Sequence, residues 1–246
     1  MVKKGCQIFL IFIAAFFICS CGIEDVPYLY PIPDGDIRPD LVFGATVLIP
    51  SSNDPTFTHW AIFYKIYVSD ILTNTPLAMM ATLNPTLGSD WNAIVPHIDS
   101  DTAVPIRMDD FFRGRRFFPL ELQYPDRINT VLSSSVFGDR LRFEFPSMGM
   151  PTMTVMSTGT TYTLWRSIGP PTNEARPDRY FRNRPELSGI IETGINVDVA
   201  PNTTLAPGAR IVTYVAMFIV AMGRDHATQT VVNSTPSLIN IFRLPD

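Results

Sequence analysis

Arginine and aromatic side chains occur together in two stretches of the sequence. Residues 111–118 and residues 176–184 each combine several arginines with phenylalanine or tyrosine. A guanidinium group pairs with carboxylates and phosphates through two hydrogen bonds and stacks on aromatic rings, and both residue types are enriched where partners bind. We therefore predict a surface for an anionic glycan, a protein partner or lipid head groups at Arg113, Arg115, Arg116, Arg179, Tyr180, Arg182 and Arg184. The alternative is that both stretches are solvated loops whose aromatic rings belong to the core.

Catalytic residues are not indicated by any spacing in the sequence. The chain has no Gly-x-Ser-x-Gly motif, no His-Glu-x-x-His motif and no paired cysteine motif. Hydrolysis of a glycosidic bond needs two carboxylates across a cleft, and the sequence does not rank the candidates Asp109, Asp110 and Asp126. We therefore predict no catalytic residue and no cofactor.

One short segment alternates side chains that bind metals. His97, Asp99 and Asp101 would project to the same side of an extended segment and would meet a divalent cation there. Polar turns show the same pattern, and the other two histidines, His59 and His226, are distant in the sequence. No metal ligand is therefore predicted.

The first residues have the layout of an export signal. Lys3 and Lys4 precede an apolar run at residues 8–18, which ends close to Cys21. The run has about 11 residues, whereas a helix needs roughly 20 to cross the hydrocarbon core of a bilayer. We expect residues 1–20 to be removed as a signal peptide.

The segment Ile18-Cys19-Ser20-Cys21 resembles the lipobox of bacterial lipoproteins, although Cys19 stands where that family usually has a small residue. The resemblance covers residues 1–21 and implies cleavage before Cys21 and lipid on its sulfur. Cys6, Cys19 and Cys21 are the only cysteines, so the mature chain would hold one thiol and no internal disulfide. Lipidation explains this lone thiol, and the alternative is an ordinary secretory signal with incidental cysteines.

The chain that remains after residues 1–20 is acidic and begins with a proline-rich segment. Without residues 1–20 it has 226 residues with 17 basic and 23 acidic side chains, a formal charge of −6. A general nucleic-acid binder is basic, so we expect no nucleic-acid partner. The prolines between Gly22 and Asp40 predict an extended tether, unless Tyr28, Leu29 and Tyr30 pack onto the domain.

The body of the chain predicts a mainly β fold, because apolar residues alternate with polar ones and β-branched and aromatic residues are frequent. Strands 42–49 and 60–68 suit a sheet with one buried side, which places Lys65 on the outer side. Residues 211–222 are apolar at nearly every position and predict a central strand buried on both faces. Further strands are expected at residues 140–145, 228–232 and 238–244, with a hairpin at residues 153–165.

Two segments resemble parts of a fibronectin type III or immunoglobulin-like β-sandwich. Residues 60–67 look like the third strand, and residues 214–221, with Gly223 and then Ser234-Thr235-Pro236, are similar to the penultimate strand, its turn and the entry to the last strand. A plain module has about 100 residues, so residues 73–208 would carry a large insertion or an inserted second β subdomain. The expected organisation is a signal peptide at 1–20, the lipidated Cys21 and tether at 21–40, and the sandwich at 41–246. An unrelated sandwich or barrel is the alternative.

These patterns predict a lipid-anchored protein of the bacterial cell envelope. The outer membrane or cell surface is favoured over the inner membrane, since Gly22 after the cysteine is compatible with outward sorting. The leading hypothesis is a binding or scaffold module without enzyme activity, whose partner is an envelope protein or a glycan. The alternative is a hydrolase that acts on envelope glycans. A solute-binding protein of an importer is disfavoured, because such proteins alternate strands and helices.

Overall fold

The computed structural model describes residues 29–40, 43–69, 117–124, 127–129, 131–167, 179–181, 198–199, 212–229, 231–234 and 236–244. These residues form a mainly β structure of two antiparallel sheets, with short 3-10 turns η1 (Asp34–Asp36) and η2 (Ser134–Val136). Within them, no helix is long and apolar enough to cross a membrane. The predicted mainly β fold is confirmed.

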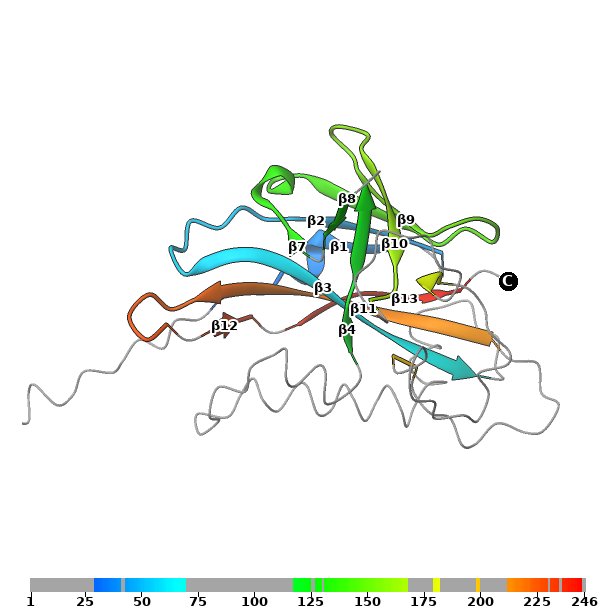
Figure 1. Ribbon diagram of the computed structural model, residues 1–246. Helices are drawn as coiled ribbons and strands as arrows, with labels where there is room; N and C mark the ends of the chain where they lie inside the picture. The colour runs from blue at the N-terminus through cyan, green and yellow to red at the C-terminus, as the bar shows by residue number, and fades with distance from the viewer. Residues whose placement is uncertain are drawn as a thin grey trace, which may run out of the picture.

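Sheet A has seven strands. Their hydrogen-bonded order is β1 (Ile37–Asp40), β2 (Gly44–Leu48), β8 (Arg140–Glu144), β9 (Thr152–Val155), β10 (Thr161–Trp165), β5 (Glu121–Tyr124) and β6 (Arg127–Asn129). Sheet B has the order β12 (Val231–Asn233), β11 (Val212–Arg224), β3 (Phe57–Ser69) and β4 (Phe118–Pro119), with β13 (Ser237–Arg243) also paired with β11 and β7 (Val131–Leu132) with β3. Figure 1 shows the blue and green strands of sheet A as a layer above the long strands β3 and β11 of sheet B.

Alternate residues of both sheets point into one shared core. Trp60, Ile62 and Tyr64 of β3 belong to the same buried cluster as Leu141 and Phe143 of β8. The period of two along each strand is what places these side chains on one face. Burial of each large apolar side chain stabilises the fold by about 1.5–3 kcal/mol.

The other face of sheet B is also buried, with Phe63 and Phe218 in a second apolar cluster. Lys65 lies on this face and is only 4% exposed, so the prediction of one buried side is wrong for β3. Its Nζ lies 5.2 Å from the ring centroid of Phe117 and 5.5 Å from that of Tyr67. A lysine stem packs well against apolar surface and its ammonium group is attracted by aromatic faces, which makes this burial compatible with the charge.

Several predicted strands are confirmed. In β11 every residue from Val212 to Gly223 is buried, as predicted for a central strand. The expected hairpin is formed by β9 and β10, and Gly159 adopts a φ of 69° in the turn between them. Strand β8 alternates as predicted. In the predicted strand 42–49, Ala45, Val47 and Ile49 are buried, whereas Phe43, which would share their face by the alternation, is 37% exposed.

The tether predicted for residues 22–40 is wrong for residues 29–40. Leu29 and Ile32 are each 2% exposed and belong to the shared core, while Tyr30 is 79% exposed. Strand β1 pairs with β2 along its whole length, and Ser237 Oγ donates a hydrogen bond of 3.0 Å to the carbonyl of Ile32. Burial of two large apolar side chains outweighs the extended preference of the proline-rich sequence. Residues 21–28 lie outside the described part.

The segment at residues 73–208, predicted to hold an insertion or a second subdomain, contributes strands to both sheets. Its described strands β5, β6, β8, β9 and β10 form most of sheet A, and β4 and β7 extend sheet B. Strand β8 pairs directly with β2 from the N-terminal part of the chain. The described part of this segment is therefore integral to the two sheets.

Candidate functional site

Five polar side chains meet in the interior where β10 ends. They come from β3, from β5, from the end of β10 and from two short segments at residues 179–181 and 198–199, and we call them the buried charge cluster: Tyr64, Glu121, Arg166, Arg179 and Asp198. Charged groups are rarely buried unless they are paired. Which of these groups pair with one another therefore decides whether any of them is available to a ligand.

Arg166 and Asp198 form the first pair of the buried charge cluster. Arg166 stands two residues after the core residue Leu164, so it points to the same side, between the sheets. Its Nε donates a hydrogen bond of 2.8 Å to Asp198 Oδ2, and its Nη2 pairs with Oδ1. The two side chains are 1% and 0% exposed. This is a bidentate ion pair that water does not reach.

Tyr64 adjoins this pair from β3. Its hydroxyl oxygen accepts a hydrogen bond of 3.0 Å from the backbone N–H of Ser167, and its ring meets Phe181 edge-on at 4.9 Å. Burial, together with the nearby Asp198 carboxylate, holds the pKa of the Tyr64 hydroxyl well above its ordinary value. The hydroxyl therefore remains protonated and serves as a hydrogen-bonding group.

Glu121 and Arg179 form the second pair. Arg179 Nη2 pairs with Glu121 Oε2, and Arg179 Nε donates a hydrogen bond of 3.3 Å to the carbonyl of Arg166. The guanidinium carbon lies 5.3 Å from the ring centroid of Trp165, within the range of a cation–π interaction. Burial raises the pKa of the Glu121 carboxyl, although Arg179 acts in the opposite direction.

The buried charge cluster attaches two short segments to the sheets. The backbone N–H of Arg166 donates to the carbonyl of Arg179 at 2.9 Å, and that of Ile66 donates to the carbonyl of Asp198 at 3.0 Å. Single β-bridges join Trp165 to Tyr180 and Ile66 to Val199. Because each charged group is paired with another member of the cluster, the cluster holds residues 179–181 and 198–199 against the sheets. It therefore acts as an anchor inside the fold.

The predicted ligand-binding residues are placed only in part. Arg179 is 1% exposed and paired with Glu121, so its guanidinium faces the interior, because a carboxylate distant in the sequence meets it there. Tyr180 is half-buried, with its ring 6.4 Å from that of Trp165. The other predicted residues lie outside the described part of the chain: Cys21, Arg113, Arg115, Arg116, Arg182 and Arg184. The same holds for His97, Asp99, Asp101, Asp109, Asp110 and Asp126.

A second candidate site lies on the outer surface of sheet A. Its cross-strand rows run from Asp40 through Gly44, Glu144, Thr152 and Thr163 to Gln123, and from Arg38 through Thr46, Arg142 and Thr154 to Thr161. All of these residues are exposed or half-buried, and we call them the polar face. The sequence already contained this signal, since these are the polar positions that alternate with the core positions in the same strands.

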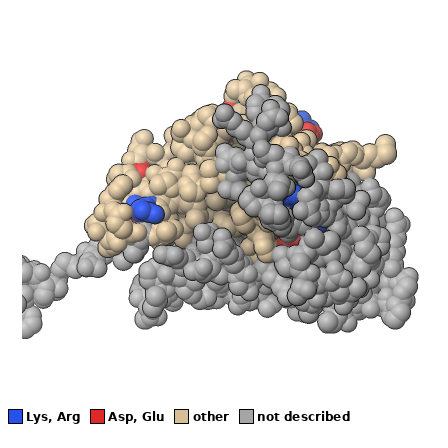
Figure 2. All heavy atoms as spheres, viewed as in Figure 1, with Lys and Arg blue, Asp and Glu red and all other residues tan. Residues whose placement is uncertain are grey.

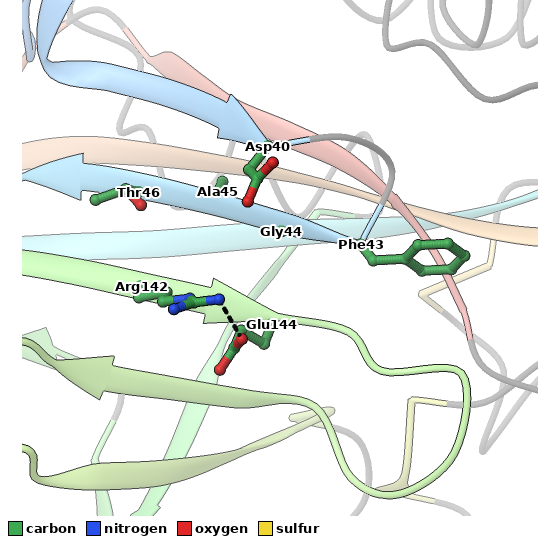
Figure 3. Close-up of a pocket in the computed structure, with 7 residues that line it drawn as sticks. All are labelled: Asp40, Phe43, Gly44, Ala45, Thr46, Arg142 and Glu144. Atoms are coloured by element: carbon green, nitrogen blue, oxygen red, sulfur yellow. Dashed lines mark ion pairs between the residues drawn. The ribbon is translucent and has the colours of Figure 1, made fainter.

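A surface hollow of about 170 Å³ lies at one end of the polar face (Figure 3). It is lined by Asp40, Phe43, Gly44, Ala45, Thr46, Arg142 and Glu144. Arg142 Nη2 lies 2.8 Å from Glu144 Oε1, in an ion pair whose side chains are 52% and 44% exposed. In Figure 3 the Phe43 ring points away from this pair, while the Asp40 carboxylate extends over the strand that carries Gly44. The hollow is therefore polar, with groups of both charges.

The charges on the face of the described residues that Figure 2 shows are scattered. In Figure 2 the arginine, aspartate and glutamate side chains of the described residues stand singly or in small groups among uncharged residues. Within these residues, no group of three or more histidine, cysteine, aspartate or glutamate side chains is arranged to hold a metal ion.

Comparisons with known proteins return no match: no protein family, no curated protein and no solved structure matches this chain. The candidate sites therefore rest on the residues and on their geometry.

Proposed function

We propose that this chain is a lipoprotein of the bacterial envelope whose β domain binds a partner without catalysis. The outer membrane or cell surface is favoured over the inner membrane as its location. The observation that carries the proposal is the lipobox-like segment that ends at Cys21, eight residues before Leu29, the first core residue in the described part of the chain. Lipid on Cys21 would give the chain a stable membrane attachment, provided that two or more acyl chains are present.

The short distance in sequence between Cys21 and Leu29 defines the reach of the anchor. At 3.3–3.6 Å per fully extended residue, these eight residues span at most about 29 Å. The domain would therefore stay close to the lipid surface, and the long tether that the sequence predicted is not needed.

The end of the domain that would face the lipid is the one where Leu29 enters the core. A Cβ built on Gly223 would come within 2.8 Å of Leu29 Cδ1 and 2.3 Å of the carbonyl oxygen of Thr56. Leu29 thus lies beside the start of β3 and the end of β11. The turn at Asp225–Gln229, which follows β11, belongs to the same end.

We further infer a β-sandwich of the fibronectin type III or immunoglobulin-like kind. In such sandwiches the third, sixth and seventh strands share one sheet. Here β3 carries the segment that resembles the third strand, β11 carries the one that resembles the penultimate strand, and both share sheet B with the last strand, β13. The seven strands of sheet A depart from the four-stranded partner sheet of those families.

Fatty-acid labelling tests the anchor. Cells grown with a clickable fatty acid should label the wild-type chain and the Cys19→Ser variant, whereas the Cys21→Ser variant should stay unlabelled. Cys19→Ser is the matched control, because it removes a thiol two residues away and brings the segment closer to a lipobox. Label on Cys21→Ser would overturn the proposal.

Crosslinking in cells tests the binding role. A photoreactive residue at Thr161, an exposed position on the polar face, should capture a defined envelope protein or glycan. The same group at Asp34, which is exposed in η1 and is not one of the residues of the polar face, is the control. Equal and unspecific capture at both positions would contradict a binding module that uses the polar face.

A further inference from the structure

The hollow on the polar face has the donors and acceptors of a small binding site. The Asp40 carboxylate only accepts hydrogen bonds, and no described residue pairs with it. On the opposite side, Arg142 donates and Glu144 accepts, while the Thr46 hydroxyl does both. A ligand that fits must therefore donate and accept hydrogen bonds within a few ångströms.

Gly44 forms the floor of this hollow. It stands between Asp40 and Glu144 in one cross-strand row, so its missing side chain leaves the space between two carboxylates open. A Cβ at this position would lie 3.2 Å from the carbonyl oxygen of Asp40, tighter than most real contacts. The opening is thus produced by the glycine and by the spacing of three adjacent strands, β1, β2 and β8.

The charges around the hollow balance. Asp40 and Glu144 carry negative charge, Arg142 carries positive charge within the hollow, and Arg38 stands beside Thr46 in the neighbouring row. An anionic ligand would meet two carboxylates, and a compact cation would meet Arg142 at close range. A neutral ligand rich in hydroxyl groups satisfies all of these side chains, since each hydroxyl donates one hydrogen bond and accepts two.

We propose that this hollow binds a neutral sugar ring, and thus that the ligand of the binding module is a neutral glycan. The inference rests on the proposed binding function and names the ligand class. Gly44 begins β2, whereas the chain after β2 reaches Thr56, which lies beside Gly223 together with Leu29. The hollow is therefore at the end of β2 away from Leu29. A glycan at the hollow would therefore approach from the side away from the lipid.

Saturation-transfer NMR on the full chain in detergent tests this inference, with glucose and N-acetylglucosamine as probes. Both sugars should receive saturation from the wild-type protein. Asp40→Asn and Arg142→Gln should weaken binding roughly tenfold or more, because each removes a charged hydrogen-bonding group. Arg140→Gln is the matched control: it lies on the same strand but outside the hollow, and it should bind like the wild type.

Three results would overturn the sugar assignment. The first is no saturation transfer to either sugar, and the second is equal binding by Arg142→Gln and Arg140→Gln at unchanged unfolding midpoints. Displacement of bound sugar by lysine methyl ester at equal concentration would also count against it, since the site would then prefer a cation. If neither sugar binds but Thr161 gives specific crosslinks to an envelope protein, the sugar assignment fails and the proposed binding function stands. If a sugar binds but the wild-type chain takes up no fatty acid, the lipid anchor fails and the sugar assignment stands.

Discussion

Replacement of Asp198 by asparagine should destabilise the protein strongly. Asp198 and Arg166 are 0% and 1% exposed, Arg166 Nη2 pairs with Asp198 Oδ1, and the hydrogen bond from Arg166 Nε to Asp198 Oδ2 is 2.8 Å. Two unit charges about 4 Å apart interact by about 4 kcal/mol at an effective dielectric constant of about 20. Loss of one partner of a buried pair typically costs about 3–5 kcal/mol. We expect a loss of this size for Asp198→Asn, measured by urea unfolding, with a midpoint lower by about 1–1.5 M.

An exposed ion pair provides the control for this measurement. Glu144→Gln breaks the pair with Arg142, whose side chain is 52% exposed, and should change the free energy of unfolding by less than about 1 kcal/mol. The double replacement of Arg166 by methionine and Asp198 by leucine should recover most of the loss, since well-packed apolar side chains often replace a buried pair at little cost. If Asp198→Asn costs no more than Glu144→Gln, our account of the buried charge cluster as an anchor is refuted.

Further predictions concern the N-terminal segment, one glycine and one carboxyl group. Leu29→Ala should lower the free energy of unfolding, measured by thermal unfolding, by about 2–4 kcal/mol, because Leu29 is 2% exposed. Tyr30→Ala should lower it by less than about 0.5 kcal/mol, because Tyr30 is 79% exposed. Equal losses would exclude this segment from the fold. Gly223→Ala should lower the melting temperature markedly, since its Cβ would lie 2.3 Å from a backbone oxygen, and an unchanged value would contradict that close approach. Glu121 has a raised pKa in the folded state because burial outweighs Arg179, so it binds a proton more readily when folded. The free energy of unfolding of the wild type, compared with that of Glu121→Gln, should therefore increase as the pH falls from the raised pKa of folded Glu121 toward 4.5, its ordinary pKa. Urea unfolding at a series of pH values measures this difference. An opposite slope would show that pairing with Arg179 outweighs burial.

Local sequence pattern was sufficient wherever a strand's environment is uniform. The unbroken apolar run of β11 predicted a strand buried on both faces, and the alternation in β8 predicted its inward residues Leu141 and Phe143. The glycine turn between β9 and β10 was also predictable, because both strands of that hairpin are adjacent in the sequence. These features depend on neighbours only a few residues away.

Contacts between distant residues were not predictable. Arg179 was predicted to face a ligand, but its partner Glu121 stands 58 residues earlier in the chain. Lys65 was expected on the solvent side of its strand, because its side chain is charged. The strand sequence alone does not show that the rings of Tyr67 and Phe117 lie beside its ammonium group. Leu29 was assigned to a tether since prolines surround it, and only the packed core shows that its burial prevails.

The pairing of β3 with β11 has a consequence for the time course of folding. The hydrogen bond from Thr58 Oγ1 to the carbonyl of Met222 joins residues 164 positions apart. At 5–20 residues per second, a ribosome needs roughly 8–30 s to add that length of chain. During this interval β3 lacks its long neighbour β11, and of its partners only the short strands β4 and β7 have been made. Pairings between such distant residues also form slowly once the chain is complete. The newborn chain therefore presents an apolar strand of 13 residues to other chains for longer than a local hairpin would.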